Sequence, residues 1–250
     1  MAPIGKSRAR VRRVTEARSG PRAGSSTQYT SDSLILGLDE AGRGSLIGPL
    51  VVGGFALRAD RLDSLVAAGV RDSKQLSPER RETVYAALGR LGRRFSVPLP
   101  PSVVDAHVRR GRLNHLEAEV FGRLVRRAGP SAVYVDACDP VAERFGQEVL
   151  SWARLDIPIV SEHRADETYP VVAAASIVAK VRRDRAVARL RSAVGERLGS
   201  GYPSDELTCA FVREILRTGA PAPPWVRQSW RTMRRLKPRP VAPTLESFHR

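Results

Sequence analysis

The stretch Leu34-Ile-Leu-Gly-Leu-Asp-Glu-Ala-Gly-Arg-Gly44 joins a short apolar run to a polar, glycine-rich connector. The apolar run Leu34–Leu38 predicts a buried strand, and Leu50–Leu57 predicts a second strand. Because the connector is short, the two strands are expected to pair antiparallel. The first strand would then carry two carboxylates, Asp39 and Glu40, at its end.

Strands and helices alternate through the second half of the chain. Ala132–Val135 and Ile157–Val160 predict strands, and Val141–Trp152 predicts a helix between them. Pro170–Val194 predicts a long helix that is rich in small residues where it begins. Strand–helix–strand spacing implies a parallel crossover. An antiparallel opening followed by such units predicts an α/β fold with a mixed sheet flanked by helices.

Other elements are expected around this framework. Helices are predicted at Ala59–Ala68, from Ser77-Pro78 through Leu91, and from an Asn114 cap through Val125. A strand is predicted at Phe95–Val97, closed by the prolines that follow it. Two more helices are predicted around Glu206–Leu216 and Val226–Leu236. The last two helices form a C-terminal helical extension.

Charge divides the chain into a folded part and two tails. The 250 residues carry a formal net charge of +16, which favours polyanionic partners such as nucleic acid through counterion release. Residues 1–33 are basic and lack periodicity, so they predict a disordered arm; a transit peptide has a similar composition. Residues 34–236 form the expected folded domain, and residues 237–250 a Pro-rich linker and flexible tail.

Two cysteines cannot form a disulfide framework, so a reducing compartment, the cytoplasm, is expected. No apolar run approaches the length of a membrane span, so no membrane partner is expected.

Acidic residues gather where the predicted strands end: Asp39 and Glu40, then Asp136, then Asp166 just before the small-residue helix. Ligand sites in α/β sheets lie beyond strand ends, so these carboxylates are candidates for one cluster. Converging carboxylates repel unless cations neutralise them, and hard oxygen ligands favour Mg²⁺ or Mn²⁺. The alternative is that these acids are helix caps or solvated turn residues. Metal-free cleavage of a phosphodiester by acid–base catalysis would usually need paired histidines, whereas the four histidines here are scattered.

Several motifs, in order, resemble the ribonuclease HII family. The opening motif is Gly37-Leu-Asp-Glu-Ala-Gly-Arg-Gly44. Further matches are Arg71-Asp-Ser-Lys-Gln-Leu76, Tyr134-Val-Asp136, Ala165-Asp166, Tyr169–Lys180 and Gly199-Ser-Gly-Tyr-Pro-Ser-Asp205. The resemblance therefore covers about residues 34–236. The motifs are more similar to the archaeal branch of the family than to the bacterial one.

The resemblance implies a ribonuclease H-like fold and a four-carboxylate site of Asp39, Glu40, Asp136 and Asp166 that holds Mg²⁺ or Mn²⁺. It also implies that Gly42, Arg43 and Gly44 read the RNA–DNA junction, that Tyr202 packs on a sugar there, and that Lys74 lies near the phosphate backbone. Ser45 stands where the family usually has proline, which is expected to loosen this loop.

The tail Thr244-Leu-Glu-Ser-Phe248 resembles a sliding-clamp-binding motif, with Ala242 where glutamine is expected and His249 in place of the second aromatic residue. A sliding clamp is therefore a candidate partner; the alternative is a frayed C-terminus.

The activity implied is endonucleolytic hydrolysis, by a two-metal-ion mechanism, of the RNA strand of RNA–DNA hybrids and 5′ of single ribonucleotides in duplex DNA, which leaves 3′-hydroxyl and 5′-phosphate ends. The chain is expected to act as a monomer. A non-catalytic hybrid-binding protein is the alternative from another class. Ribonuclease HIII is a nearer alternative, but that type carries an extra folded N-terminal domain.

Overall fold

The computed structural model describes residues 30–70 and 76–236. The chain divides into two compact units, each described here by itself. The sheet unit comprises the residues up to Ala41, Val51–Pro98 and Arg112–Arg183; the helical unit comprises Gly42–Leu50, Leu99–Gly111 and the residues from Asp184 onward. The predicted C-terminal tail, and all but the last four residues of the predicted arm, lie outside the described residues.

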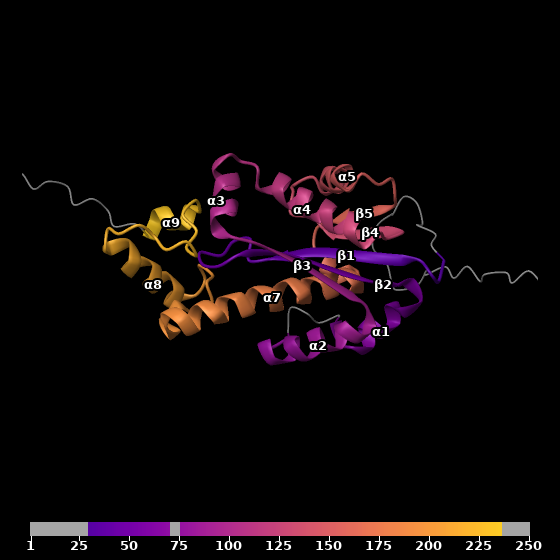
Figure 1. The fold of residues 1–250 in the computed structure, drawn as a ribbon, viewed down its shortest axis with the longest axis horizontal. Helices are drawn as coiled ribbons and strands as arrows, with labels where there is room; N and C mark the ends of the chain where they lie inside the picture. The colour runs from indigo at the N-terminus through magenta and orange to yellow at the C-terminus, as the bar shows by residue number, and fades with distance from the viewer. Residues whose placement is uncertain (1–29, 71–75, 237–250) are drawn as a thin grey trace, which may run out of the picture. The chain divides into compact units, whose positions relative to one another are not determined.

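A five-stranded mixed sheet of order β3-β2-β1-β4-β5 organises the sheet unit (Figure 1). Central strand β1 (Leu34–Ala41) pairs antiparallel with β2 (Leu50–Arg58) and parallel with β4 (Ala132–Asp136). β5 (Ile159–Glu162) continues the sheet parallel to β4, and β3 (Arg93–Leu99) lies beside β2 on the other side. The predicted mixed sheet, with its antiparallel opening and parallel crossover, is confirmed.

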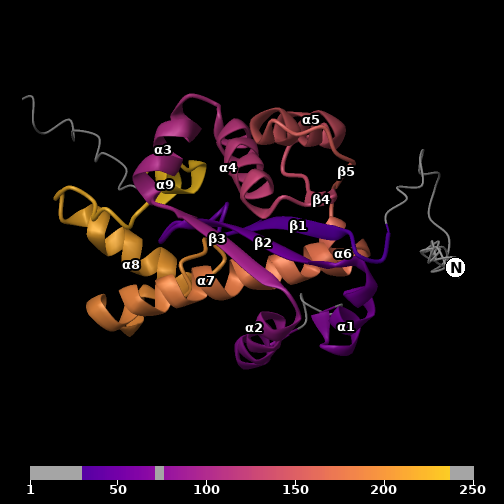
Figure 2. The ribbon, with the colours of Figure 1, turned by 45° about the vertical axis from the view of Figure 1, so that its right-hand side comes forward.

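Helices cover both faces of this sheet. α4 (Leu113–Ala128) and α5 (Ala142–Ala153) lie together on one face (Figure 1). On the other face lie α1 (Leu62–Ala67), α2 (Pro78–Leu91) and the first part of α7 (Pro170–Val194), as a second view also shows (Figure 2). The main buried apolar cluster contains residues of β1, β2, β4 and these three helices, so the core lies between the sheet and α7.

The small residues at the start of α7 let the helix backbone approach the strands. Ala173, Ala174 and Ala175 are almost fully buried. A Cβ atom on Gly37 of β1 would lie 2.1 Å from the carbonyl oxygen of Val171, which leaves room only for glycine there. Small residues on both sides of this contact therefore set the spacing between α7 and the sheet.

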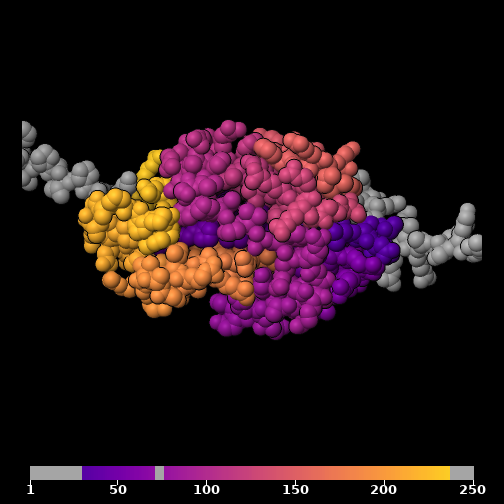
Figure 3. All heavy atoms as spheres, in the orientation of Figure 1, coloured from indigo at the N-terminus to yellow at the C-terminus, as the bar shows by residue number. Residues whose placement is uncertain are grey.

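The helical unit has its own apolar cluster. The helices of this unit are α3 (Pro101–Arg109), the end of α7, α8 (Glu206–Arg217) and α9 (Arg231–Leu236). The cluster joins residues of the loop after β1 to the C-terminal helices: Leu46, Ile47, Val187, Leu198, Cys209, Val212, Val226, Met233 and Leu236. In the space-filling view the orange and yellow atoms of α7 and α8 form one continuous surface (Figure 3).

Most element predictions are confirmed, and the exceptions have local causes. Ser77 caps α2 as predicted, because its side chain accepts a hydrogen bond from the Arg80 N–H at 3.2 Å. Asn114 does not cap a helix: α4 begins at Leu113, and the Asn114 amide donates instead to Asp139 at 2.8 Å. Short 3₁₀ turns occupy Ala59–Arg61 and Glu196–Leu198.

Two helices differ more from the predictions. The prolines after Val97 predict only the end of a strand, whereas Pro101 occupies the first turn of helix α3, where its missing N–H costs nothing. The C-terminal helix begins at Arg231 rather than Val226, because Val226 forms a β-bridge with Ile47. Within residues 30–70 and 76–236, no helix is long and apolar enough to cross a membrane.

Candidate active site

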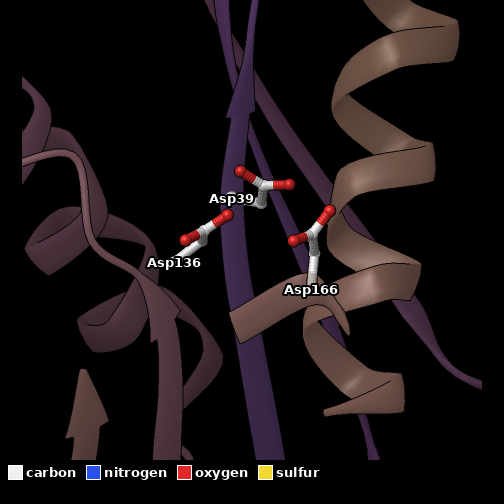
Figure 4. Close-up of side chains that lie close together, drawn as sticks. All are labelled: Asp39, Asp136 and Asp166. Carbon is white, nitrogen blue, oxygen red and sulfur yellow. The ribbon is translucent and has the colours of Figure 1, made fainter. Parts of the chain in front are cut away.

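Three aspartates converge in the sheet unit. Asp39 lies near the end of β1, Asp136 is the last residue of β4, and Asp166 lies in the short helix α6 (Ala165–Thr168). The parallel register pairs Leu38 with Val135, so Asp39 and Asp136 follow side by side on neighbouring strands. Each offers a carboxylate oxygen within 4.8 Å of the others, and the three side chains point toward one another (Figure 4).

Glu40, the fourth predicted carboxylate, is not part of this close group. Successive side chains of a strand point to opposite faces, so Glu40 and Asp39 leave β1 in different directions. Glu40 still contacts its neighbour through the backbone, because its N–H donates to Asp39 Oδ1 at 2.6 Å. The structure thus brings together three of the four predicted carboxylates and leaves Glu40 beside them.

The surroundings of Asp39 favour its neutral form. Burial raises the pKa of Asp39 well above its ordinary value, and the negative charges of Glu40 and Asp136 raise it further. The hydrogen bond from the Glu40 N–H and the nearby Ser176 hydroxyl oppose this rise only in part. A cation among these oxygens would reverse the effect, since it stabilises the ionised carboxylates.

Backbone geometry joins Asp136 to Asp166. The N–H of Ala165 donates to Asp136 Oδ1 at 3.3 Å, which ties the end of β4 to the start of α6. Arg164, just before it, has a φ of 59°, in the left-handed region that non-glycine residues rarely occupy. The ring of His163 contacts the carbonyl oxygens of Ala137 and Pro140 at 3.1 and 3.4 Å. These contacts connect the segment that follows β4 to the segment that precedes α6, next to Asp136 and Asp166.

The segment after Asp136 is braced by residues that the sequence did not single out for this role. The buried carboxylate of Asp139 accepts hydrogen bonds from the Asn114 amide at 2.8 Å, the Val141 N–H at 2.9 Å and Arg144 at 2.6 Å. Although burial raises the pKa of Asp139, these hydrogen bonds together lower it below its ordinary value. No sequence signal marks Asp139 except its position three residues after Asp136.

The three aspartates fit a divalent metal ion by donor type and geometry. The group consists of carboxylate oxygens alone, the ligands that Mg²⁺ and Mn²⁺ prefer. They come from a strand, a strand end and a helix, and Asp39 and Asp166 are buried. Buried carboxylates at such distances need a positive charge between them, so the site is suited to hold a cation.

The predicted substrate-binding residues Gly42, Arg43 and Gly44 form a loop in the helical unit. Gly42 has a φ of 84°, which favours glycine, and Gly44 is exposed. The expectation that Ser45 loosens this loop is wrong. Ser45 is fully buried, and its hydroxyl donates to the Gly42 carbonyl at 2.9 Å, so the side chain closes the turn.

Tyr202 lies half-buried in the loop Gly199–Ser204 of the same unit. The carbonyl of Gly201, just before it, accepts hydrogen bonds from the N–H groups of Leu46 and Ile47 at 2.8 and 3.2 Å. The backbone therefore links the Tyr202 loop to the segment that follows Gly44. Lys74 lies outside the described residues.

A mixed five-stranded sheet that carries an aspartate cluster at the ends of β1 and β4 defines the chain as a ribonuclease H-like nuclease. The family model of ribonuclease HII matches residues 36–233. The chain belongs to the ribonuclease HII family.

Relatives and solved structures agree with this assignment. Ribonuclease HII of Cenarchaeum symbiosum is 45% identical over 80% of this chain and 97% of its own length. The crystal structure of ribonuclease H2 from Pyrococcus horikoshii OT3 matches with a TM-score of 0.75 and 37% identity, over 82% of this chain and 97% of that one. The ribonuclease HII in the PCNA:RNase HII complex from Archaeoglobus fulgidus matches with the same TM-score and identity, over 86% of this chain and 100% of that one.

Membership of the family establishes the general activity. The chain is a ribonuclease H, an enzyme that cleaves the RNA strand of RNA–DNA hybrids. Enzymes of this family use divalent metal ions, and the aspartate triad is able to bind one. The resemblance to the archaeal branch is also confirmed.

Proposed function

We propose that this enzyme also cuts duplex DNA on the 5′ side of a single embedded ribonucleotide, and that its products carry 3′-hydroxyl and 5′-phosphate ends. The observation that carries the proposal is the convergence of Asp39, Asp136 and Asp166, whose oxygens lie within 4.8 Å of one another. This group contains carboxylates alone, whereas attack by the 2′-hydroxyl typically uses paired histidines. Attack by water instead leaves the phosphate on the 5′ end.

Asp39, Asp136 and Asp166, together with Glu40, would hold two Mg²⁺ or Mn²⁺ ions. When bound, such ions supply an activated water and neutralise the charge that develops on the phosphodiester. The contribution of the chain itself is preorganisation. Asp39 is held on a central strand, and Asp136 is oriented by the Ala165 N–H, so the carboxylates need little rearrangement when they bind a cation.

Recognition of the ribonucleotide would rest on the helical unit. The backbone of Gly42, Arg43 and Gly44 would approach the RNA–DNA junction in the minor groove, where the 2′-hydroxyl distinguishes RNA from DNA. Tyr202 would pack on the sugar at the junction. Lys74 would contact the phosphate backbone.

The experiment that tests this function uses one labelled DNA duplex with a single ribonucleotide. The purified protein is incubated with Mg²⁺ or Mn²⁺, and EDTA is added to the control. Metal-dependent cutting on the 5′ side of the ribonucleotide, with ends that a DNA ligase or polymerase recognises as 5′-phosphate and 3′-hydroxyl, is the expected result.

Two other outcomes would lead to different conclusions. Cleavage of a long hybrid without cutting at the single ribonucleotide would indicate a preference like that of ribonuclease HIII. Binding of both substrates without cleavage, in either metal, would indicate a non-catalytic hybrid-binding protein.

The C-terminal tail would bind a sliding clamp. The support is the resemblance of Thr244–Phe248 to a clamp-binding motif, together with the existence of a clamp complex for the related Archaeoglobus fulgidus enzyme. Residues 237–250 lie outside the described residues, so the test is biochemical. The full chain should bind an archaeal clamp in surface plasmon resonance, and Phe248→Ala should abolish that binding without a change in cleavage of free duplex.

A further inference from the structure

Arg227 carries a buried charge in the helical unit. It lies between α8 and α9, and its relative exposure is 0%. Its guanidinium donates two hydrogen bonds to backbone carbonyls of one loop: Nη1–H to Arg43 at 2.8 Å and Nε–H to Gly48 at 3.1 Å. Burying a guanidinium is costly unless its donors are satisfied, so these two hydrogen bonds offset part of the cost of burying Arg227.

The backbone around Arg227 is itself held on both sides. The N–H of Arg227 donates to the Leu46 carbonyl at 2.8 Å. The next two N–H groups, of Gln228 and Ser229, donate to the buried carboxylate of Asp105 on α3 at 2.8 and 3.0 Å. The guanidinium is therefore presented to the loop from a fixed position.

The loop that receives these bonds is Gly42–Gly48, and its first turn is Gly42–Ser45. The Gly42 carbonyl accepts from the Ser45 hydroxyl at 2.9 Å, and the Arg43 carbonyl accepts from Arg227. In a trans peptide, the carbonyl of one residue and the N–H of the next point in opposite directions. The N–H groups of Arg43 and Gly44 therefore point away from Ser45 and from the guanidinium of Arg227.

We propose that Arg227 is a positioning residue for ribonucleotide recognition, because it holds the Arg43 carbonyl inward and so turns the Gly44 N–H toward the nucleic acid. Ser45 does the same for the preceding peptide. This inference rests on the proposed role of Gly42–Gly44 in reading the RNA–DNA junction. Arg227 acts through the loop backbone and makes no contact with the substrate.

Arginine suits this role better than lysine or glutamine. Its planar guanidinium presents several N–H groups in a rigid arrangement, so two carbonyls can be bound at once in fixed directions. A lysine ammonium is a point charge on a flexible stem, and glutamine offers a single amide group. Arg227→Lys should therefore retain part of the effect, and Arg227→Gln little of it.

The test measures discrimination rather than activity alone. Cleavage of a labelled duplex with one ribonucleotide is followed in Mg²⁺ while an unlabelled all-DNA duplex of the same sequence competes. The ratio of the inhibition constant of the DNA duplex to the KM of the ribonucleotide duplex measures how well the enzyme recognises the ribose. Arg227→Gln should lower this ratio by about tenfold, because the Gly44 N–H would lose its hydrogen bond to the ribonucleotide and one well-oriented hydrogen bond is worth about that factor.

A matched control separates positioning from stability. Val212→Ala shortens a fully buried side chain of the same apolar cluster that contains Leu46 and Val226, and Val212 lies on α8. It should lower the melting temperature of the protein yet leave the discrimination ratio unchanged. Ser45→Ala tests the other side of the loop, and it should lower the ratio by about threefold.

Each outcome has one meaning. If the unmodified protein does not cut the ribonucleotide duplex, the proposed function fails. If it cuts with good discrimination and Arg227→Gln keeps the same ratio, the positioning role of Arg227 is refuted. If Arg227→Gln does not fold at the assay temperature, Arg227→Lys and Ser45→Ala replace it, and unchanged ratios in both would equally refute the proposal.

Discussion

At the scale of single residues, the buried carboxylate of Asp39 is repelled by the negative charges of its neighbours Glu40 and Asp136. Burial and the charges of Glu40 and Asp136 raise the pKa of Asp39, so the aspartate group is less stable without a cation than with one. Removing one of these charges should therefore affect stability and catalysis in opposite directions.

Because Asp136 is proposed as a metal ligand, Asp136→Asn should lower the cleavage rate by at least about a hundredfold. In EDTA, its melting temperature should equal or exceed that of the unmodified protein, since one repulsive charge beside Asp39 is gone. Hybrid binding, measured by fluorescence anisotropy, should be retained. Substantial turnover by Asp136→Asn would remove this residue from the mechanism.

Arg164 gives a second residue-scale prediction, because its left-handed φ of 59° costs roughly 1 kcal/mol for a non-glycine residue. Its side chain is largely exposed, and its ion pair with Glu167 at 2.8 Å contributes little. Arg164→Gly should therefore raise the free energy of unfolding by about 0.5 kcal/mol in urea titrations. Arg164→Ala loses the ion pair without relieving the backbone, so it should be slightly destabilising; a similar loss for both variants would contradict the argument.

At this scale the sequence predicted the site in part. Three carboxylates converge because each lies near, at or just beyond the end of a strand, and the strands can be predicted from apolar runs. Glu40 differs because side chains alternate along β1. The contact of Arg227 with the Arg43 carbonyl joins residues 184 positions apart, and no local pattern around Arg227 distinguishes it from a solvated arginine.

At the scale of elements, the packing of α7 on the sheet depends on glycine. A Cβ atom on Gly53 of β2 would lie 2.5 Å from the Ala175 carbonyl oxygen and 2.8 Å from Ala179 Cβ, both on α7. Gly53→Ala should therefore lower the free energy of unfolding by about 2–3 kcal/mol, because the helix must shift. Gly44→Ala is a control for stability alone, since nothing lies within 4 Å of its Cβ position. Equal melting temperatures for the two variants would show that α7 can shift away from Gly53 at little cost in stability.

The start of α8 provides a pH-dependent prediction. The Asp205 side chain caps the helix by accepting from the Leu207 N–H at 3.0 Å. Hydrogen bonding from the Ser200 backbone, then from the Ser200 and Thr208 side chains and the Leu207 N–H, lowers the pKa of Asp205, although burial opposes this. Because the folded pKa is depressed, the stabilisation is complete above the ordinary value of 3.8 and is lost as the pH falls through the folded value.

Asp205→Ala should lower the free energy of unfolding by about 1 kcal/mol at pH 7. The difference from the unmodified protein should shrink below pH 4, as chemical denaturation at a series of pH values would measure. If the difference in the free energy of unfolding stayed constant at the lowest pH values tested, the charge of Asp205 would not contribute to stability.

The sequence predicted most elements but not every boundary. Apolar residues located all five strands and the long α7, and the Ser77-Pro78 pair located the start of α2. Helix α3 was not predicted, because Pro100 and Pro101 at its start are equally compatible with the end of a strand. The start of α9 escaped because Val226 bridges Ile47, a long-range contact that overrides helical periodicity.

At the scale of the whole molecule, the formal charge of +16 should govern affinity for nucleic acid. Residues 1–29 contribute seven basic side chains against a single acid, Glu16. Deleting residues 2–29 should weaken hybrid binding at low salt and make the slope of log Kd against log salt concentration shallower. Anisotropy titrations in EDTA at several NaCl concentrations would measure this, with cleavage-site choice as the control. An unchanged slope would show that the arm does not contact phosphate.

The bonds between Arg227 and the carbonyls of Arg43 and Gly48 also have a consequence for biosynthesis. Translation runs from the N-terminus, so all three aspartates leave the ribosome well before Arg227 does. A nascent or prematurely terminated polypeptide would therefore carry the three aspartates while the loop Gly42–Gly48 still lacks the two hydrogen bonds from the Arg227 guanidinium. If Arg227 positions this loop as proposed, selectivity for the ribonucleotide would be completed only after Arg227 has left the ribosome.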